Sequence, residues 1–133
     1  MKPFHIEIVT PDGLIYDGQA ESVLVRTHDG DVEILANHTD YIAPLATGRA
    51  RLIIDGQKRF AAINGGFISV TKGEVKLVTI TFEYSDQIDL SRAKAAKEKA
   101  ENKLKAANDA NTERLVKAKL ARAISRIKVA GQK

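Results

Sequence analysis

The composition of the chain changes abruptly near residue 85. All seven aromatic residues, all three prolines and eight of the nine glycines lie in residues 1–84. Residues 85–133 carry 13 Lys or Arg against 6 Asp or Glu, a net charge of +7, so residues 1–84 carry −3 of the chain's total of +4. Aromatic residues favour strands, whereas Ala, Lys and Glu favour helices. We therefore predict two parts: a β domain over residues 1–84 and a helical domain over residues 85–133.

The first part has the pattern of an antiparallel β-sandwich. Residues 4–10 alternate apolar and polar side chains with the period of two that a half-buried strand requires. Gly, Asn, Asp and Pro separate the further apolar segments at nearly even spacing, which is typical of a sandwich or barrel. The further predicted strands are residues 14–17, 21–27, 32–35, 49–54, 58–64, 67–71 and 74–81.

Two glycine-containing segments favour strand connections over ligand binding. Asp55-Gly56 predicts a two-residue hairpin, since a type I′ turn needs positive φ at both central residues. A phosphate-binding loop needs a helix directly after it. Asn64-Gly65-Gly66 is followed by the strand-like residues 67–70, so we interpret it as a hairpin or a bulge.

The second part predicts an antiparallel pair of helices. Small apolar residues recur at helical spacing from Ala93 to Ala107, and bulkier ones from Val116 to Ala130. Asp89 lies where a helix N-cap or first-turn acid is favoured. The polar residues 108–112 interrupt the pattern, and Thr112 is the predicted N-cap of the second helix.

An antiparallel hairpin that turns near Asp109 brings several cations to similar levels. It places Arg92 beside Arg126, Ala96 beside Arg122, and Lys99 beside Lys119. Such a cluster repels itself unless an anion lies within it, and guanidinium groups suit phosphate oxygens. The residues therefore allow a polyphosphate or nucleotide between the helices. Taken alone, however, they favour an ordinary basic hairpin whose charges are solvated.

Other chemistry has little support in the sequence. Zero Cys excludes disulfides and thiolate metal sites, and the three His have no metal-ligand spacing. No Walker-type motif and no convergent acid–base or nucleophile set is present, so we predict a non-enzyme without a catalytic or metal site. The absence of a long apolar run and of a secretory signal predicts a location in the cytoplasm or on its membrane face.

The chain resembles the epsilon subunit of bacterial, Bacillus-type F-type ATP synthases over essentially its whole length. The resemblance is carried by residues 38–45 (HTDYIAPL), residues 64–70 (NGGFISV) and above all residues 88–93 (IDLSRA). It implies a sandwich of about ten strands in the rotating central stalk, followed by a mobile helical hairpin. It further implies a peripheral location on the cytoplasmic face of the bacterial plasma membrane, with the gamma subunit, the c-ring and the alpha and beta subunits as partners and no nucleic acid.

The same resemblance implies a regulatory role for ATP, with which Mg²⁺ can bind. The hairpin is expected to fold down against the sandwich when ATP is bound, and otherwise to extend along gamma and inhibit ATP hydrolysis. Asp31 and His38 match c-ring contacts. The residues implied for ATP are Ile88, Asp89 and Glu83 on the base or ribose side, Arg92, Arg122 and Arg126 for the phosphates, and Ala93 and Lys99 beside them.

Two departures from the family pattern accompany the resemblance. Lys99 occupies a position where nucleotide-binding members tend to have Arg, and Lys lacks the planar fork of a guanidinium group. Glu33, Ala36 and Asn37 alter the loop before His38. Two alternative functions follow from the residues alone: a basic helical module that binds nucleic acid, and an interaction adaptor without a ligand.

Overall fold

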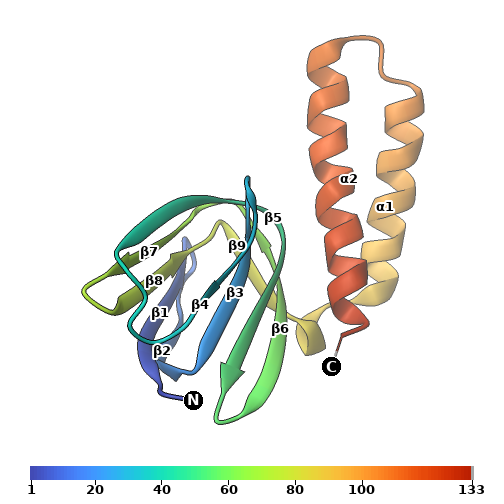
Figure 1. Ribbon diagram of the computed structural model, residues 1–133. Coiled ribbons are helices and arrows are strands. Elements are labelled where there is room, and N and C mark those ends of the chain that lie inside the picture. Colours follow the sequence, from blue (N-terminus) through green and yellow to red (C-terminus); the bar gives the residue numbers. More distant parts are fainter. Residues whose placement is uncertain (133) are drawn as a thin grey trace.

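The computed structural model describes residues 1–132, which form a β-sandwich and a two-helix hairpin (Figure 1). Lys133, the last residue of the predicted helical domain, lies outside the described residues. The described strands are β1 (Phe4–Thr10), β2 (Gly13–Ala20), β3 (Ser22–Thr27), β4 (Gly30–Ile34), β5 (Tyr41–Ile54), β6 (Gln57–Asn64), β7 (Phe67–Thr71), β8 (Glu74–Val78) and β9 (Thr81–Tyr84). The described helices are the short 3₁₀ helix η1 (Ser85–Gln87), α1 (Leu90–Lys105) and α2 (Ala110–Ala130).

The predicted β-sandwich is confirmed. One layer contains β2, β1, β8, β7 and the first half of β5, and the other contains β4, β3, the second half of β5, β6 and β9. Alternate side chains of β1 and its neighbours fill the space between the layers. All pairs are antiparallel except β1 with β8, which is parallel. Local periodicity carries no information on strand direction, so this pair was not predicted.

Strand β5 is more than twice as long as predicted, because residues 41–48 were not recognised as part of it. Residues 41–48 contain Pro44 and Gly48, which usually interrupt strands. In the structure Pro44 lies opposite Phe67 in one layer, while residues 48–54 pair with β6 in the other. The strand therefore joins both layers. The predicted strand over residues 74–81 is likewise wrong in extent, since the chain changes partners near Ile80 and continues as β9.

The two glycine segments connect strands in different ways. Asp55 and Gly56 have φ values of 51° and 75° between the paired strands β5 and β6, which confirms the predicted two-residue hairpin. The Gly65-Gly66 connection is not a hairpin, because β6 pairs with β5 and β9 whereas β7 pairs with β5 and β8. A Cβ atom on Gly66 would lie 1.8 Å from the carbonyl oxygen of Val78, so a side chain has no room where the chain crosses between layers.

The hairpin has the predicted two helices, with one correction. Asp89 is the N-cap of α1 and accepts a hydrogen bond from the backbone N–H of Arg92. The N-cap of α2 is Asp109 and not Thr112. Asp109 accepts hydrogen bonds from the backbone N–H and the hydroxyl of Thr112, because a carboxylate is at least as good a cap as a hydroxyl and lies three residues earlier.

Helix α2 packs between α1 and the sandwich. It contacts β5, β6 and η1, while α1 packs on the far side of α2 (Figure 1). The seam between the helices buries Ala93, Ala100, Val116 and Ala123. Near its C-terminal end α2 also buries Val129, beside β5. The hairpin thus lies against the sandwich, with a charged border between the two parts.

Candidate functional site

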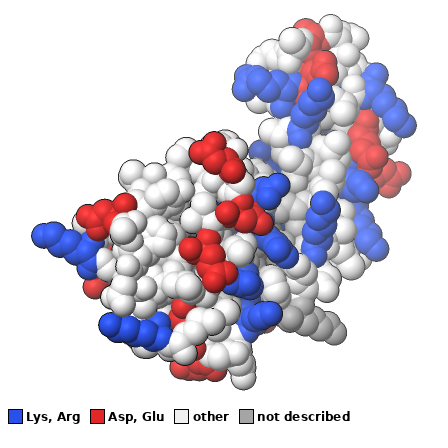
Figure 2. All heavy atoms as spheres, viewed as in Figure 1, with Lys and Arg blue, Asp and Glu red and all other residues white. Residues whose placement is uncertain are grey.

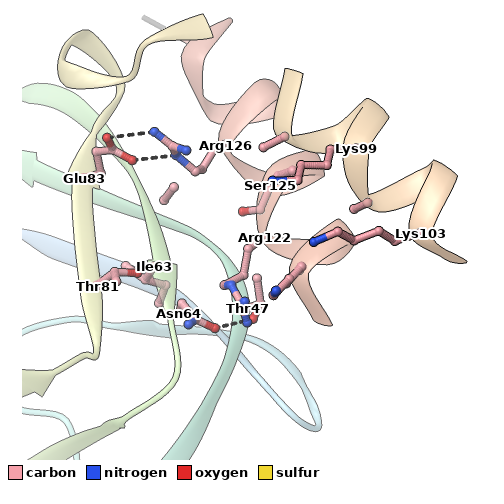
Figure 3. Close-up of a pocket in the computed structure, with 15 residues that line it drawn as sticks. Thr47, Ile63, Asn64, Thr81, Glu83, Lys99, Lys103, Arg122, Ser125 and Arg126 are labelled. Carbon is pink, nitrogen blue, oxygen red and sulfur yellow. Dashed lines mark hydrogen bonds and ion pairs between the residues drawn. The ribbon is translucent and has the colours of Figure 1, made fainter. Parts of the chain in front are cut away.

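A cavity of about 460 Å³ lies between the hairpin and the sandwich, and we call it the interface cavity (Figure 3). Strands β5, β6 and β9 form one wall, and the facing sides of α1 and α2 form the other. Its polar and charged lining residues are Thr47, Asn64, Thr81, Glu83, Lys99, Lys103, Lys119, Arg122, Ser125 and Arg126, and its apolar ones are Ala62, Ile63, Ala96, Ala100 and Ala123.

The interface cavity is strongly basic. Five of its lining side chains are Lys or Arg, and Glu83 is its one carboxylate. Figure 2 shows Lys and Arg gathered along the hairpin and its border with the sandwich, while acidic side chains gather on the sandwich. Within residues 1–132, no carboxylate lies within 4.0 Å of the charged nitrogens of Lys99, Lys103, Lys119 or Arg122. These four cations therefore lack a local counter-ion in the described structure.

Arg126 differs from the other cations because it joins the hairpin to the sandwich. Its Nε lies 2.8 Å from Glu83 Oε1, and its Nη2 lies 3.2 Å from Glu83 Oε2 (Figure 3). Both side chains are about 30% exposed, at 28% for Arg126 and 31% for Glu83. A paired guanidinium–carboxylate contact of this kind fixes orientation as well as charge. The Glu83–Arg126 pair holds α2 against β9.

A second polar pair lies on the sandwich wall. The Thr47 hydroxyl donates a hydrogen bond to Asn64 Oδ1 at 2.7 Å. This contact occupies the acceptor side of the Asn64 carboxamide and leaves its NH₂ group as the free donor. The sandwich therefore adds neutral hydrogen-bond donors to a cavity whose helical wall is cationic.

Four of the eight predicted nucleotide residues lie in this cavity: Glu83, Lys99, Arg122 and Arg126. The other four lie near its border. Asp89 and Arg92 are exposed, and Ala93 is fully buried in the helix seam. Ile88 is half-buried in the two-residue linker, residues 88–89, that connects η1 to α1. One oxygen of Asp89 is already occupied by capping α1.

The prediction of which α1 and α2 residues lie side by side is only partly correct. Ala96 and Arg122, and Lys99 and Lys119, line the same cavity, but Arg92 does not line it with Arg126. The turn is centred between residues 107 and 108, because α1 ends at Lys105 and α2 begins at Ala110. Arg92 still belongs to the helical stripe of Ala96, Lys99 and Lys103, one turn outside the cavity.

Sequence reasoning missed several lining residues. Lys103 follows Lys99 by four residues, so helical spacing could have revealed it. Ser125 adjoins Arg126 in the sequence but carried no signal of its own. Thr47, Asn64 and Thr81 come from three strands, and their meeting with the hairpin depends on the tertiary fold.

The two predicted c-ring residues lie at opposite ends of β4. Asp31 is near its start and forms an ion pair with Arg26, with Nη1 and Oδ1 3.2 Å apart, beside the C-terminal half of α2. His38 follows the strand's end, where its ring packs edge-on against Tyr41. The structure does not bring the two side chains together.

No group of three or more His, Cys, Asp or Glu in residues 1–132 is arranged to hold a metal ion. Neither described helix is long and apolar enough to cross a membrane.

Comparisons with known proteins agree with this architecture. Residues 3–85 match the family model "ATP synthase, Delta/Epsilon chain, beta-sandwich domain", and residues 86–131 match "ATP synthase, Delta/Epsilon chain, long alpha-helix domain". An ATP synthase epsilon chain from Bacillus velezensis is 42% identical over 131 residues, covering 98% of this chain and 99% of the relative. One from Bacillus subtilis is 39% identical over 132 residues, covering 99% and 100%.

A solved structure supports the fold independently. A chain in the mitochondrial ATP synthase of Euglena gracilis superimposes with a TM-score of 0.83 at 23% identity, covering 92% of this chain and 78% of that one. The chain therefore belongs to the ATP synthase delta/epsilon chain family, as an epsilon-type, non-catalytic subunit of the complex. This confirms the resemblance that its motifs indicated.

Proposed function

We propose that the subunit binds ATP in the interface cavity as a regulatory signal. The observation that carries this proposal is the set of four cations, Lys99, Lys103, Lys119 and Arg122, which face one cavity without a carboxylate within 4.0 Å in residues 1–132. Converging cations repel one another, and a polyphosphate would relieve this repulsion. The charge of the cavity therefore supports a polyphosphate as the class of ligand.

Two features favour a nucleotide over a simple phosphate ion. The cavity combines its cations with small apolar side chains, Ala62 on the sandwich wall and Ala96 and Ala100 on α1, against which a base or ribose can pack. Glu83 can accept hydrogen bonds from an amino or hydroxyl group. Asp89, Ile88, Arg92 and Ala93 lie near the border and are assigned by resemblance alone. Mg²⁺ would enter with the phosphates, since no described acidic cluster is arranged to hold it.

Bound ATP would stabilise the folded-down hairpin, because the interface cavity has one wall from each part of the molecule. A ligand that contacts both walls binds only when they are together, and it shifts the population towards that state. When ATP is scarce, the hairpin would extend along the gamma subunit. Its unpaired cations would then meet acidic surfaces of the alpha and beta subunits and inhibit ATP hydrolysis.

The sandwich would attach the subunit to the rotor. We propose that it lies in the central stalk, contacts the gamma subunit, and reaches the c-ring through Asp31 and His38. The complex would hold it peripherally on the cytoplasmic face of the bacterial plasma membrane. A cross-link from a cysteine at position 38 to the c-ring of the assembled complex, with a cysteine at Asp12 as the comparison, tests this contact. Absence of a specific cross-link at position 38 would contradict it.

The test of ATP binding is isothermal titration of the full chain with ATP, with and without Mg²⁺. We expect one-to-one binding that Arg122→Gln weakens by about 10- to 100-fold, the range for losing a hydrogen bond to a charged group. Arg114→Gln is the matched control, because Arg114 lies on the same helix outside the cavity and bonds to Asn111. Replacing Asp89 is a poorer test, since it removes the cap of α1.

Hairpin position is measured separately by energy transfer between dyes on cysteines introduced at Asp12 and Asn108. The chain has no native cysteine, so both labels are specific. ATP should narrow the distance distribution, and Arg122→Gln should abolish that change. Equal binding by both arginine variants, or no binding at all, would contradict the proposal and favour the ligand-free adaptor.

A further inference from the structure

The two ends of the interface cavity differ in charge. Glu83 pairs with Arg126 at the end near the start of α1, and Figure 3 shows Lys103 away from this pair. Lys119, which lies early in α2, also lines the cavity. The antiparallel helices explain this order, because residues late in α1 lie beside residues early in α2. Phosphate oxygens are repelled by Glu83 and attracted by the lysines, so the cavity gives a bound nucleotide a direction.

Lys103 and Lys119 have no evident structural role in the described part of the chain. Both side chains are exposed, and neither has a carboxylate within 4.0 Å in residues 1–132. Lys117, two residues from Lys119, shows the usual alternative, with its Nζ 2.8 Å from Glu113 Oε1. In Figure 3 the Lys103 side chain extends from α1 towards Arg122.

The sandwich wall also contributes a carboxamide group, that of Asn64, to the lining of this cavity. Because Asn64 Oδ1 accepts the Thr47 hydroxyl, the Asn64 NH₂ group is free to donate. Arg126 and Lys119 are seven residues apart on α2, which corresponds to about 10 Å along the helix axis. A row of cations over this length, with the acid at one end, suits a phosphate chain that lies parallel to α2.

We propose that Lys103 and Lys119, assisted by the Asn64 carboxamide, form a subsite for the terminal phosphate of a bound nucleoside triphosphate. This inference rests on the proposed function and deepens it, because it names residues outside the 88–93 segment that would distinguish a triphosphate from a diphosphate. A diphosphate that is anchored near Arg122 and Lys99 would end about one helical turn before Lys103 and Lys119, whereas a triphosphate would extend one phosphate further towards them. The two lysines would therefore determine the preference for a triphosphate over a diphosphate.

The test compares ATP with ADP on the full chain by isothermal titration. We expect the double variant Lys103→Gln, Lys119→Gln to lose about tenfold in ATP affinity, and its ADP affinity to change by less than about twofold. The control is Lys94→Gln, Lys117→Gln, which removes one exposed lysine from each helix outside the cavity and changes the net charge equally. The control should keep the ATP-to-ADP ratio of the unmodified chain.

Each result decides between distinct explanations. An equal loss for ATP and ADP would mean that the lysines act through general charge, and it would overturn the subsite. No change for either nucleotide would overturn it as well. In both cases the unmodified chain still binds ATP, so the proposed function stands. If the unmodified chain binds neither nucleotide, the proposed function and the subsite fail together.

Discussion

The sandwich and the hairpin bury side chains of very different size. The sandwich core contains Ile6, Ile8, Leu52, Ile68 and Leu77, each with no exposed surface. The buried residues between the two helices are mostly alanines, at Ala93, Ala100 and Ala123, with Val116. Burial contributes roughly 25 cal/mol per Å² of apolar surface, so an alanine seam stabilises much less than a core of branched side chains.

This difference fits the proposed movement of the hairpin on a sandwich that stays folded. The hairpin is attached to the sandwich through α2, mainly by the Glu83–Arg126 pair and by Val129 beside β5. Because these attachments are few, contacts with a ligand or another partner can replace them. Separating the two sandwich layers would instead unfold the domain.

The largest effect should follow a truncation in the sandwich core. Leu77→Ala should lower the free energy of unfolding by about 2–5 kcal/mol, because the packed layers close such a cavity only partly. Urea denaturation followed by circular dichroism measures this loss. Ile42→Ala is the control, because Ile42 is 71% exposed and should cost less than about 0.5 kcal/mol. Similar losses for both variants would show that the core is not the main source of stability.

A smaller effect, confined to the hairpin, should follow the loss of the Glu83–Arg126 pair. Glu83→Gln should destabilise the docked hairpin by about 1 kcal/mol, the upper range for a partly exposed ion pair. Hydrogen exchange should speed up in α2 while the core strands stay protected. Glu33→Gln breaks the Arg51–Glu33 pair inside the sandwich and should leave exchange in α2 unchanged. Faster exchange throughout the chain would indicate a single cooperative unit.

A local effect should follow removal of the α2 cap. Hydrogen bonds from the Thr112 backbone and hydroxyl lower the pKa of Asp109 from its ordinary value of 3.8. The cap is therefore fully effective above this value and is lost as the pH falls through the lower folded pKa. Asp109→Ala should reduce helicity near neutral pH and remove that acidic transition. Circular dichroism between pH 5 and pH 2 tests this, and an unchanged transition in the variant would assign it to other carboxylates.

Sequence patterns were sufficient where neighbouring residues decide the structure. The alternation of residues 4–10, the Asp55-Gly56 turn and the helical spacing from Ala93 onwards depend on local geometry, and the structure has each of them. Strand β5 was only half recognised, because Pro44 and Gly48 break local preference and the surrounding layers override it. The parallel direction of β1 and β8 was not predictable either, because local periodicity carries no information on strand direction.

The interface cavity shows the same limit. Arg122, Arg126 and Lys99 were predicted because spacing and resemblance both indicated them. Asn64 and Thr47 were missed, because they meet the hairpin only after β5 and β6 have paired and α2 has packed on them. Helical position can be read from spacing, whereas contact between the two parts depends on a tertiary arrangement.

The smallest predicted effect is a pH dependence of stability that arises at β2, β1 and β8, the sandwich strands at the opposite end of their layer from β5. The His5 ring lies between the carboxylates of Asp17 on β2 and Glu74 on β8, with one ring nitrogen in hydrogen-bond contact with each. A neutral imidazole has one N–H, so only the imidazolium form can donate to both carboxylates. The Asp17 hydrogen bond, followed by that of Glu74, raises the pKa of His5 above 6.5.

The pKa of His5 is higher in the folded state than in the unfolded state. The contacts of the charged ring therefore stabilise the fold fully when the pH is below the unfolded pKa, and this stabilisation disappears as the pH rises through the folded pKa. The melting temperature of the chain should therefore fall slightly above pH 6.5, and His5→Gln should flatten this dependence. His28→Gln, at an exposed turn, should retain it. If both variants keep the full dependence, the three strands are held by their backbone ladder and the His5 contacts contribute nothing measurable.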